Sequence, residues 1–263
     1  MKDELNRVHE VYKQTQVLQA PEKPATLETL QQLSNNWKDK DIPDLQRKVV
    51  EVVLENMSKG VIDPVVASLD RLLKRIPLQS FTFLDAACAT GYYHEFIRRL
   101  DSRRIEYRGC DYSESMILAA LSCYPEVEFE VQDLTDLKYP DRSFDVVMLS
   151  GVLEHIPQWQ KALSEVCRIA GQYVIHHRCP LTPGQNHEYT IGTQYTIETP
   201  RTYFSKELLI EDYRASGFAL VKETDVYNPR STTDSVKSLA KKILRRPEEK
   251  ARSVGSFLLK RTS

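Results

Sequence analysis

Short apolar runs alternate with amphipathic stretches from residue 81 to the end of the chain. This alternation is typical of a parallel sheet whose strands are connected by helices. The pattern predicts seven strands, at 81–85, 106–111, 127–132, 144–150, 172–176, 218–226 and 256–261. Helices are predicted between them, at 95–100, 113–123, 159–169 and 206–216. The expected fold class is therefore α/β.

The first 80 residues contain no convincing strand pattern and are predicted to form a helical cap. One cap helix is predicted over 64–76, with Asp63 as its N-cap and Pro64 at its first position. The stretch 20–25, APEKPA, is predicted to be a linker or bend. Apolar residues also recur at helical spacing in an earlier segment, at Leu45, Val49, Val53 and Met57. We therefore expect a cap over 1–80 and an α/β domain over 81–263.

A strongly basic segment, 230–254, interrupts the last two predicted strands. Its residues predict an amphipathic surface helix, with Val236 and Leu239 on the apolar face and Lys241 and Arg245 on the basic face. Two interpretations stay open. The helix over 235–252 makes weak contact with an anionic membrane surface or a phosphorylated carrier, or it packs on the domain by its apolar stripe.

Composition narrows the class of protein. The chain has 263 residues, 41% of them hydrophobic, which is enough for one large domain with a substantial core. A net charge of −1 gives no general signal for nucleic acid. No apolar run is long enough to span a bilayer, so a cytoplasmic protein is expected, peripheral at the membrane if 235–252 binds lipid. The five cysteines lack metal-type spacing, so we expect reduced thiols and no metal site.

The sequence FLDAACATGYY, residues 83–93, predicts a buried strand followed by a tight turn and a helix. Small residues at alternate positions, Ala87, Ala89 and Gly91, let the backbone approach a ligand closely after Asp85. This segment resembles the D/E-x-G-x-G-x-G loop of class I S-adenosylmethionine-dependent methyltransferases. Alanine stands at two of the three glycine positions. Because alanine favours negative φ, we expect one turn to be remodelled and cofactor binding to survive in weakened form, since alanine has the smallest side chain available; a relative that does not bind the cofactor is the alternative.

Two further acidic residues follow the next predicted strands, so their carboxylates are expected at the same edge of the sheet. Asp111 begins the sequence DYSESM, which resembles a D-x-S-x-x-M segment of that family. The resemblance implies that Asp111 binds the ribose hydroxyls, while Tyr112 and Met116 pack on the adenine and ribose. The alternative is that Asp111 only caps the following helix.

Asp133 and Leu134 follow the third strand. The resemblance implies that Asp133 accepts from the adenine amino group and that the Leu134 backbone serves the ring nitrogens. Asp133 could instead be a turn residue, and Asp136 could compete for the role.

The sequence SFDVVMLSGVLEHIP, residues 143–157, resembles the type-11 subgroup of these methyltransferases. Ser150 within it is expected at the cofactor site. The resemblance covers 81–175 and implies a Rossmann-like, doubly wound, seven-stranded sheet with an antiparallel last strand. It also implies S-adenosylmethionine as cofactor.

Three histidines are candidates for a general base, because an acceptor hydroxyl would need one with a pKa near the working pH. His155 follows the fourth strand, and His176 and His177 end the fifth, where alternation directs one to each face. His155 could instead be structural, and the inward one of the pair could be a packed polar residue. Positioning without a base is the remaining alternative.

The segment 179–203 is predicted to be a long loop over the crevice, carrying His187 and several tyrosines. We expect Trp37 and the cap helices to cover the site, although helix 64–76 is expected only to pad the sheet.

The resulting hypothesis is methyl transfer to a small-molecule or sugar acceptor, at a hydroxyl, with no nucleic-acid partner. A non-catalytic binding protein with the same fold is the main alternative. A nicotinamide oxidoreductase fits the first loop alone but not Asp133 or the LEHI segment at 153–156.

Overall fold

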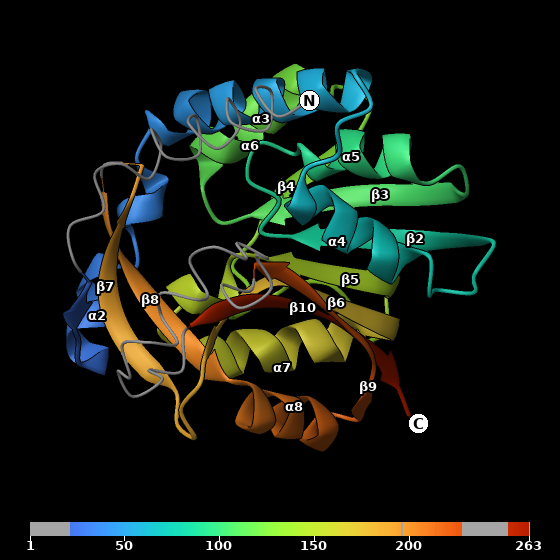
Figure 1. The fold of residues 1–263 in the computed structure, drawn as a ribbon. Coiled ribbons are helices and arrows are strands. Elements are labelled where there is room, and N and C mark those ends of the chain that lie inside the picture. The colour runs from blue at the N-terminus through green and yellow to red at the C-terminus, as the bar shows by residue number, and fades with distance from the viewer. Residues whose placement is uncertain (1–21, 196, 228–251, 263) are drawn as a thin grey trace, which may run out of the picture.

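The computed structural model describes residues 22–195, 197–227 and 252–262 (Figure 1). Its α-helices are α2 (Leu27–Leu33), α3 (Ile42–Ser58), α4 (Pro64–Leu73), α5 (Tyr93–Leu100), α6 (Glu114–Cys123), α7 (Trp159–Ile169) and α8 (Lys206–Ala215). Its strands are β1 (Lys23–Pro24), β2 (Ser80–Ala86), β3 (Arg104–Asp111), β4 (Glu128–Val131), β5 (Phe144–Ser150), β6 (Ala170–Thr182), β7 (Glu188–Gln194), β8 (Ile197–Ser205), β9 (Phe218–Tyr227) and β10 (Ser253–Arg261). Two short 3₁₀ helices, η1 (Asn36–Lys38) and η2 (Leu153–His155), lie near the carboxyl edge of the sheet.

Seven of these strands form the predicted core sheet, in the order β4-β3-β2-β5-β6-β10-β9. The pairs among β4, β3, β2, β5 and β6 are parallel, and β10 is antiparallel to both of its neighbours. The order reverses at β2, where β3 lies on one side and β5 on the other. Ligands of such sheets bind at this switch point, outside the carboxyl ends of the strands. The expected α/β fold with an antiparallel last strand is confirmed.

The sheet also contains strands that the sequence pattern did not predict. Residues 179–203 are not a loop: β6 continues to Thr182, and β7 and β8 form an antiparallel hairpin. The end of β6 pairs with β8 through Leu181 and Thr182, which joins the hairpin to the core sheet. Within the predicted helical cap and its APEKPA bend, Lys23 and Pro24 pair with β7.

Helices cover both faces of the sheet because alternate strand residues point to opposite sides (Figure 1). Leu84, Val147 and Leu149 pack with α7 and α8 on one face. Phe83 and Met148 pack with α3, α4 and α5 on the other. These two apolar layers make the sheet a rigid support for the residues that follow its strands.

Helix α4 begins as predicted, with Pro64 at its first position and Asp63 Oδ1 accepting the Val65 N–H at 2.7 Å. It packs on β9, β10 and β6 rather than over the strand ends, which matches its expected padding role. The division into a cap and a domain at residue 80 stays a prediction.

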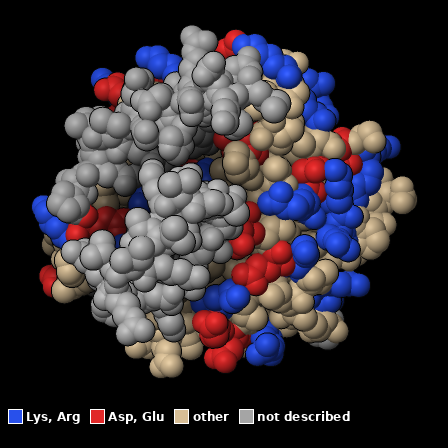
Figure 2. All heavy atoms as spheres, viewed as in Figure 1, with Lys and Arg blue, Asp and Glu red and all other residues tan. Residues whose placement is uncertain are grey.

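The basic segment 230–254 lies largely outside the described residues, so the proposed helix over 235–252 stays a prediction. Ser253 and Val254 belong to β10, which corrects the end of the segment. Basic and acidic side chains are mixed on the visible face of the described chain (Figure 2). None of the helices in the described ranges has both the length and the hydropathy that a membrane span requires.

Candidate active site

A cavity of about 310 Å³ lies at the carboxyl ends of β2, β3 and β5, at the switch point of the sheet. Its floor comes from the segments that follow these strands. The cap contributes Gln31, Ser34, Asn35, Trp37, Lys38 and Gln46, and the turn between β7 and β8 contributes Gln194 and Tyr195. The expectation that Trp37 and the first cap helices cover the site is therefore confirmed. Helix α4 does not line this cavity.

The loop after β2 has the backbone of a glycine-rich turn although it contains alanines. Ala87 and Ala89 have φ values of 69° and 51°, and Gly91 has 74°. The N–H groups of Ala87 and Cys88 both donate to the Cys110 carbonyl at 2.8 Å, which fixes the turn against β3. The expectation that alanine would keep negative φ and remodel a turn is wrong. The tight hydrogen bonding holds both residues in the left-handed region, and both line the cavity.

Replacing these alanines with glycine is expected to stabilise the protein. Relief of the left-handed strain of alanine should stabilise the fold by about 1–2 kcal/mol. Glycine also makes the unfolded chain more flexible, which destabilises the fold by about 0.5–1 kcal/mol. Ala89→Gly should therefore gain on the order of 0.5 kcal/mol. Denaturant unfolding would measure this, with Ala119→Gly in α6 as the control. The control should lose about 1 kcal/mol, because its backbone is helical. Equal losses in both variants would contradict the strain assignment.

Asp111 both supports the loop and faces the cavity. Its Oδ2 accepts the Ala89 N–H at 3.0 Å, and its Oδ1 accepts the Ser113 N–H at 2.9 Å before α6 begins. The side chain is 7% exposed, and burial raises its pKa to about 6. The two interpretations of Asp111 are thus compatible, because each carboxylate oxygen has a second lone pair for a ligand.

Asp133 lines the cavity from the loop after β4. Its Oδ1 accepts from the backbone N–H and the hydroxyl of Thr135, at 2.7 and 2.9 Å, as a turn residue does. Leu134 is buried beside it and also lines the cavity. Asp136 pairs with Lys138 at 2.5 Å and does not line it, which removes Asp136 as the competitor.

Tyr112 and Met116 complete this end of the cavity. The Tyr112 hydroxyl donates to the Ser34 carbonyl at 2.9 Å, and Lys38 lies 5.0 Å from the centre of its ring. These contacts join the cap to the segment after β3. Tyr112, Met116, Asp111 and Asp133 therefore surround one space, as the resemblance implied.

Asp85 and Gly91 lie behind the loop rather than in the cavity. Asp85 is fully buried and accepts a hydrogen bond at 2.6 Å from the Tyr107 hydroxyl. Burial raises its pKa to about 7, with a smaller contribution from Asp111. A Cβ on Gly91 would lie 2.6 Å from the Phe129 ring, so this glycine serves packing.

The raised pKa of Asp85 gives a signed prediction for stability. The carboxyl stabilises the fold while protonated, and that contribution is lost as the pH rises through about 7. The free energy of unfolding of Asp85→Asn, minus that of the wild type, should therefore increase by on the order of 2 kcal/mol when the pH is raised from about 5 to about 8. Denaturant unfolding at both pH values measures the difference. A constant difference would contradict the burial of an ionisable carboxyl here.

His176 and His177 do not line the cavity. His176 points into the core beneath α8, where its Nδ1 lies 3.0 Å from the Tyr213 hydroxyl. His177 points to the opposite face and hydrogen-bonds the Val65 carbonyl through Nε2 at 3.1 Å. Burial lowers the pKa of both to about 3. The two side chains point to opposite faces of the sheet, as the alternation along the strand predicted. The cavity lies beyond the strand ends rather than on either face, so neither histidine lines the space for an acceptor.

Ser150 lines the cavity and connects it to His177. Its hydroxyl donates to the Tyr93 hydroxyl at 2.7 Å and lies 3.0 Å from His177 Nδ1. This buried group of side chains fixes the end of β5 against α4 and α5.

His155 is the one candidate histidine that lines the cavity. Its Nδ1–H donates to the Pro200 carbonyl at 2.7 Å, and its ring centre lies 4.8 Å from that of Trp37. Burial, and then the charge of Arg201, lowers its pKa to about 3. A neutral imidazole with this pKa is a poor general base at neutral pH and suits a positioning role.

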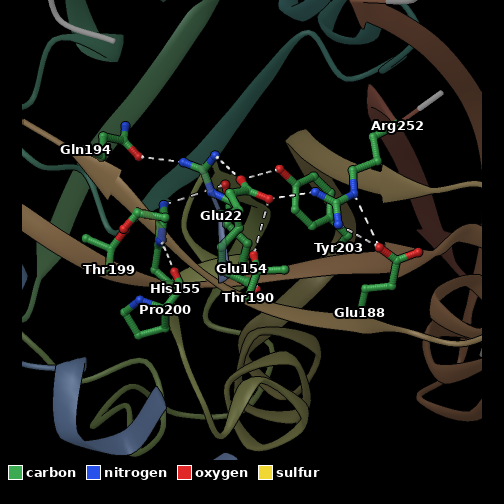
Figure 3. Close-up of polar contacts among 12 residues, drawn as sticks. Glu22, Glu154, His155, Glu188, Thr190, Gln194, Thr199, Pro200, Tyr203 and Arg252 are labelled. Carbon is green, nitrogen blue, oxygen red and sulfur yellow. Dashed lines mark hydrogen bonds and ion pairs between the residues drawn. The ribbon is translucent and has the colours of Figure 1, made fainter. Parts of the chain in front are cut away.

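The β7–β8 hairpin reaches the cavity only through its turn, at Gln194 and Tyr195. His187 instead accepts the Ser205 N–H at 3.0 Å and packs on Trp159. Figure 3 shows how charged side chains hold the outer part of the hairpin. Arg252 pairs with Glu22 at 2.6 Å and with Glu188 at 2.8 Å, which ties the first described residue of the cap and the residue before β10 to β7.

Several lining residues were not predicted, and two of them, Gln46 and Arg178, have structural contacts that matter most for the site. Gln46 on α3 accepts from the Thr90 N–H and hydroxyl, at 3.2 and 2.8 Å, and so joins the cap to the loop after β2. Arg178 lines the cavity at the point where β6 leaves β5. A polar residue among the mainly apolar positions of the buried α3 face was the available signal for Gln46. Nothing in the sequence distinguished Arg178 from the neighbouring histidines.

Comparisons with known proteins agree with this geometry. Residues 84–172 match a family described as "Methyltransferase domain", of the type-11 kind. A probable S-adenosylmethionine-dependent methyltransferase of Mycolicibacterium smegmatis is 31% identical over 108 residues, covering 39% of this chain and 41% of that protein. A demethylmenaquinone methyltransferase of Bacillus licheniformis is 28% identical over 91 residues, covering 34% and 39%. The chain thus spans about two fifths of the length of these curated relatives.

The fold likeness extends further along the chain. A crystal structure of magnesium protoporphyrin IX methyltransferase from Synechocystis PCC 6803, with bound S-adenosylmethionine, matches with a TM-score of 0.50. It covers 74% of this chain and 77% of that one at 17% identity, which shows the fold. The matched family, the sheet order and the cavity at its switch point agree: residues 84–172 match a class I S-adenosylmethionine-dependent methyltransferase domain of the type-11 kind, and the chain around them has the same fold.

Proposed function

We propose that this chain transfers a methyl group from S-adenosylmethionine to a small-molecule acceptor. The observation that carries the proposal is Asp111, a buried carboxylate that holds the loop after β2 and still faces the cavity. Such a group suits the two hydroxyls of a ribose. S-adenosylmethionine, when bound, supplies a methyl group on a positively charged sulfur.

The residues around Asp111 suit the rest of this cofactor. Asp133 and the Leu134 backbone would hold the adenine, with Tyr112 and Met116 packed on adenine and ribose. Ala87 and Ala89 would face the amino-acid part of the cofactor, because both residues line the cavity and their left-handed backbone keeps the turn that glycine usually forms. Ser150 lies at the end of β5, next to the part of the cavity left for an acceptor.

The acceptor is proposed to be small because the cap and the hairpin turn both line the cavity. The Bacillus licheniformis relative is named for demethylmenaquinone, which is also a small molecule. A hydroxyl, on a sugar or another small metabolite, stays the proposed nucleophile. Since His155 is neutral with a pKa near 3 and is a poor base, a sugar hydroxyl would have to react through positioning alone, whereas a phenolic hydroxyl, which ionises more readily, needs less help. Alignment of donor and acceptor away from bulk water then supplies most of the catalysis.

Isothermal titration with S-adenosylmethionine, S-adenosylhomocysteine and NADH tests the cofactor part of this proposal. Micromolar binding of the first two, with no binding of NADH, is expected. Failure of both sulfur ligands to bind would support a non-catalytic protein with this fold, and binding of NADH would support an oxidoreductase.

A further inference from the structure

Arg178 lies at the end of the cavity opposite Asp111 and Asp133. His177 is the last residue of β6 paired with β5, and Arg178 follows it with a φ of 59°. Its N–H donates to the Ser256 hydroxyl at 3.1 Å, which fixes this turn of the backbone against β10. A Cβ on Gly151 would lie 3.2 Å from the guanidinium carbon, so the side chain lies over the turn after β5. The fold therefore delivers a guanidinium to the cavity wall.

The charges along the cavity are divided between its ends. Among the described residues that line it, the acidic ones are Asp111 and Asp133, which follow β3 and β4. Arg178 comes from β6, on the other side of β2 in the sheet order. The second cation of the lining, Lys38, lies over the Tyr112 ring near the aspartates. Arg178 is thus the cation at the end of the cavity away from the aspartates, where it hydrogen-bonds the Tyr93 hydroxyl and its charge also acts on the buried Glu154 carboxyl.

Aromatic side chains share the cavity with this cation. Tyr92, Tyr195 and Trp37 line the same cavity, and the rings of Trp37 and Tyr195 are 6.0 Å apart. The charge of Arg178 acts to lower the pKa of the hydroxyls of Tyr92 and Tyr195, although burial raises both. Tyr92, Tyr195, Gln46 and Arg178 also line a second cavity of about 40 Å³, whose other walls are mainly valines of α3 and α4. A planar fork of donors beside apolar walls suits a carboxylate attached to an apolar body.

We propose that the acceptor is an organic acid whose carboxylate binds the guanidinium of Arg178, with its apolar part against Trp37, Tyr92 and Tyr195. This inference rests on the proposed methyl transfer and specifies its substrate class. The carboxylate of the cofactor is a second source of the same chemistry. The test therefore separates the two carboxylates.

The experiment uses the full chain saturated with S-adenosylhomocysteine, so that no turnover occurs. Thermal shifts and calorimetry are recorded with salicylate, 4-hydroxybenzoate and 4-hydroxyphenylacetate, and with the methyl ester of each acid. The variants are Arg178→Gln and Arg178→Lys, with Lys38→Gln as the control that removes the other lining cation. Affinity for S-adenosylhomocysteine is measured first for every variant.

We expect at least one acid to bind the wild type at least tenfold more tightly than its ester. Arg178→Gln should abolish that preference, Arg178→Lys should retain part of it, and Lys38→Gln should retain it. The affinity of Arg178→Gln for S-adenosylhomocysteine should stay within threefold of the wild type.

Three results would overturn the inference while leaving methyl transfer intact. These are binding of no acid to the wild-type complex, an acid preference that survives in Arg178→Gln, and a tenfold or greater loss of S-adenosylhomocysteine affinity in that variant. The last would assign Arg178 to the cofactor carboxylate. If the wild type itself fails to bind S-adenosylhomocysteine, the proposed function fails first.

Discussion

Asp111→Ala should weaken S-adenosylmethionine binding by about 100-fold, or about 3 kcal/mol, because two charge-assisted hydrogen bonds to the ribose are lost. The loss includes a loop contribution, since Asp111 Oδ2 accepts the Ala89 N–H at 3.0 Å. The fold should survive, because the apolar layers on both faces of the sheet do not depend on this carboxylate. Calorimetric titration with the cofactor measures the affinity, and circular dichroism checks the fold.

Asp136→Ala is the matched control, because Asp136 is an exposed aspartate outside the cavity that pairs with Lys138. Its cofactor affinity should equal that of the wild type. A pH titration adds an independent readout, because the pKa of Asp111 is raised to about 6. The ionised form binds the ribose, so wild-type affinity should hold above pH 6 and fall below it. Unchanged binding by Asp111→Ala would remove the ribose assignment.

The sequence predicted β2 and β5 well because each is a short apolar run with a polar residue, Asp85 or Ser150, near its end. The predicted strand that ends at Asp111 lies within β3, which is more polar. The polar residues after such strands must lie at one edge of a parallel sheet, whatever their loops do. This explains why Asp111 and Asp133 lie at one cavity as expected, whereas Asp85, which is still inside β2, is buried behind the loop.

The hairpin was missed because threonine and tyrosine are common both in strands and in polar loops. The segment EYTIGTQ of β7 is only partly buried, with Thr190 and Gly192 alone buried in its pattern, so its alternation of apolar and polar residues is weak. Its strand structure depends on pairing with β8, from Glu188 opposite Tyr203 to Gln194 opposite Ile197. Long-range pairing of this kind overrides local preference.

The histidines show a different limit of sequence analysis. Side chains of a strand point to the faces of the sheet, whereas this cavity lies beyond the strand ends. His176 and His177 therefore enter the two apolar layers, and Arg178, where β6 leaves β5, reaches the cavity. Only the register of β6 against β5 identifies this point, and register depends on tertiary packing.

Gly91→Ala should destabilise the protein by about 3 kcal/mol, the largest stability effect expected among single substitutions in the loop after β2. Its φ of 74° costs alanine about 1–2 kcal/mol, as it already does at Ala87 and Ala89. The added Cβ would also lie 2.6 and 2.9 Å from atoms of the Phe129 ring and 3.3 Å from Ala120 Cβ. Phe129 is buried between β3, β4 and α6, so the ring cannot move away without opening that cluster.

Gly60→Ala separates the two causes, because Gly60 has a φ of 77° but no atom within 4 Å of the added Cβ. It should lose only the backbone part, about 1 kcal/mol. Denaturant unfolding of both variants measures the difference, and equal losses would show that the Phe129 contact contributes nothing. A larger loss in Gly91→Ala, with Ala89→Gly gaining stability, would establish that this loop keeps glycine where side chains crowd it. It would also show that alanine is tolerated where the backbone faces open space for the cofactor.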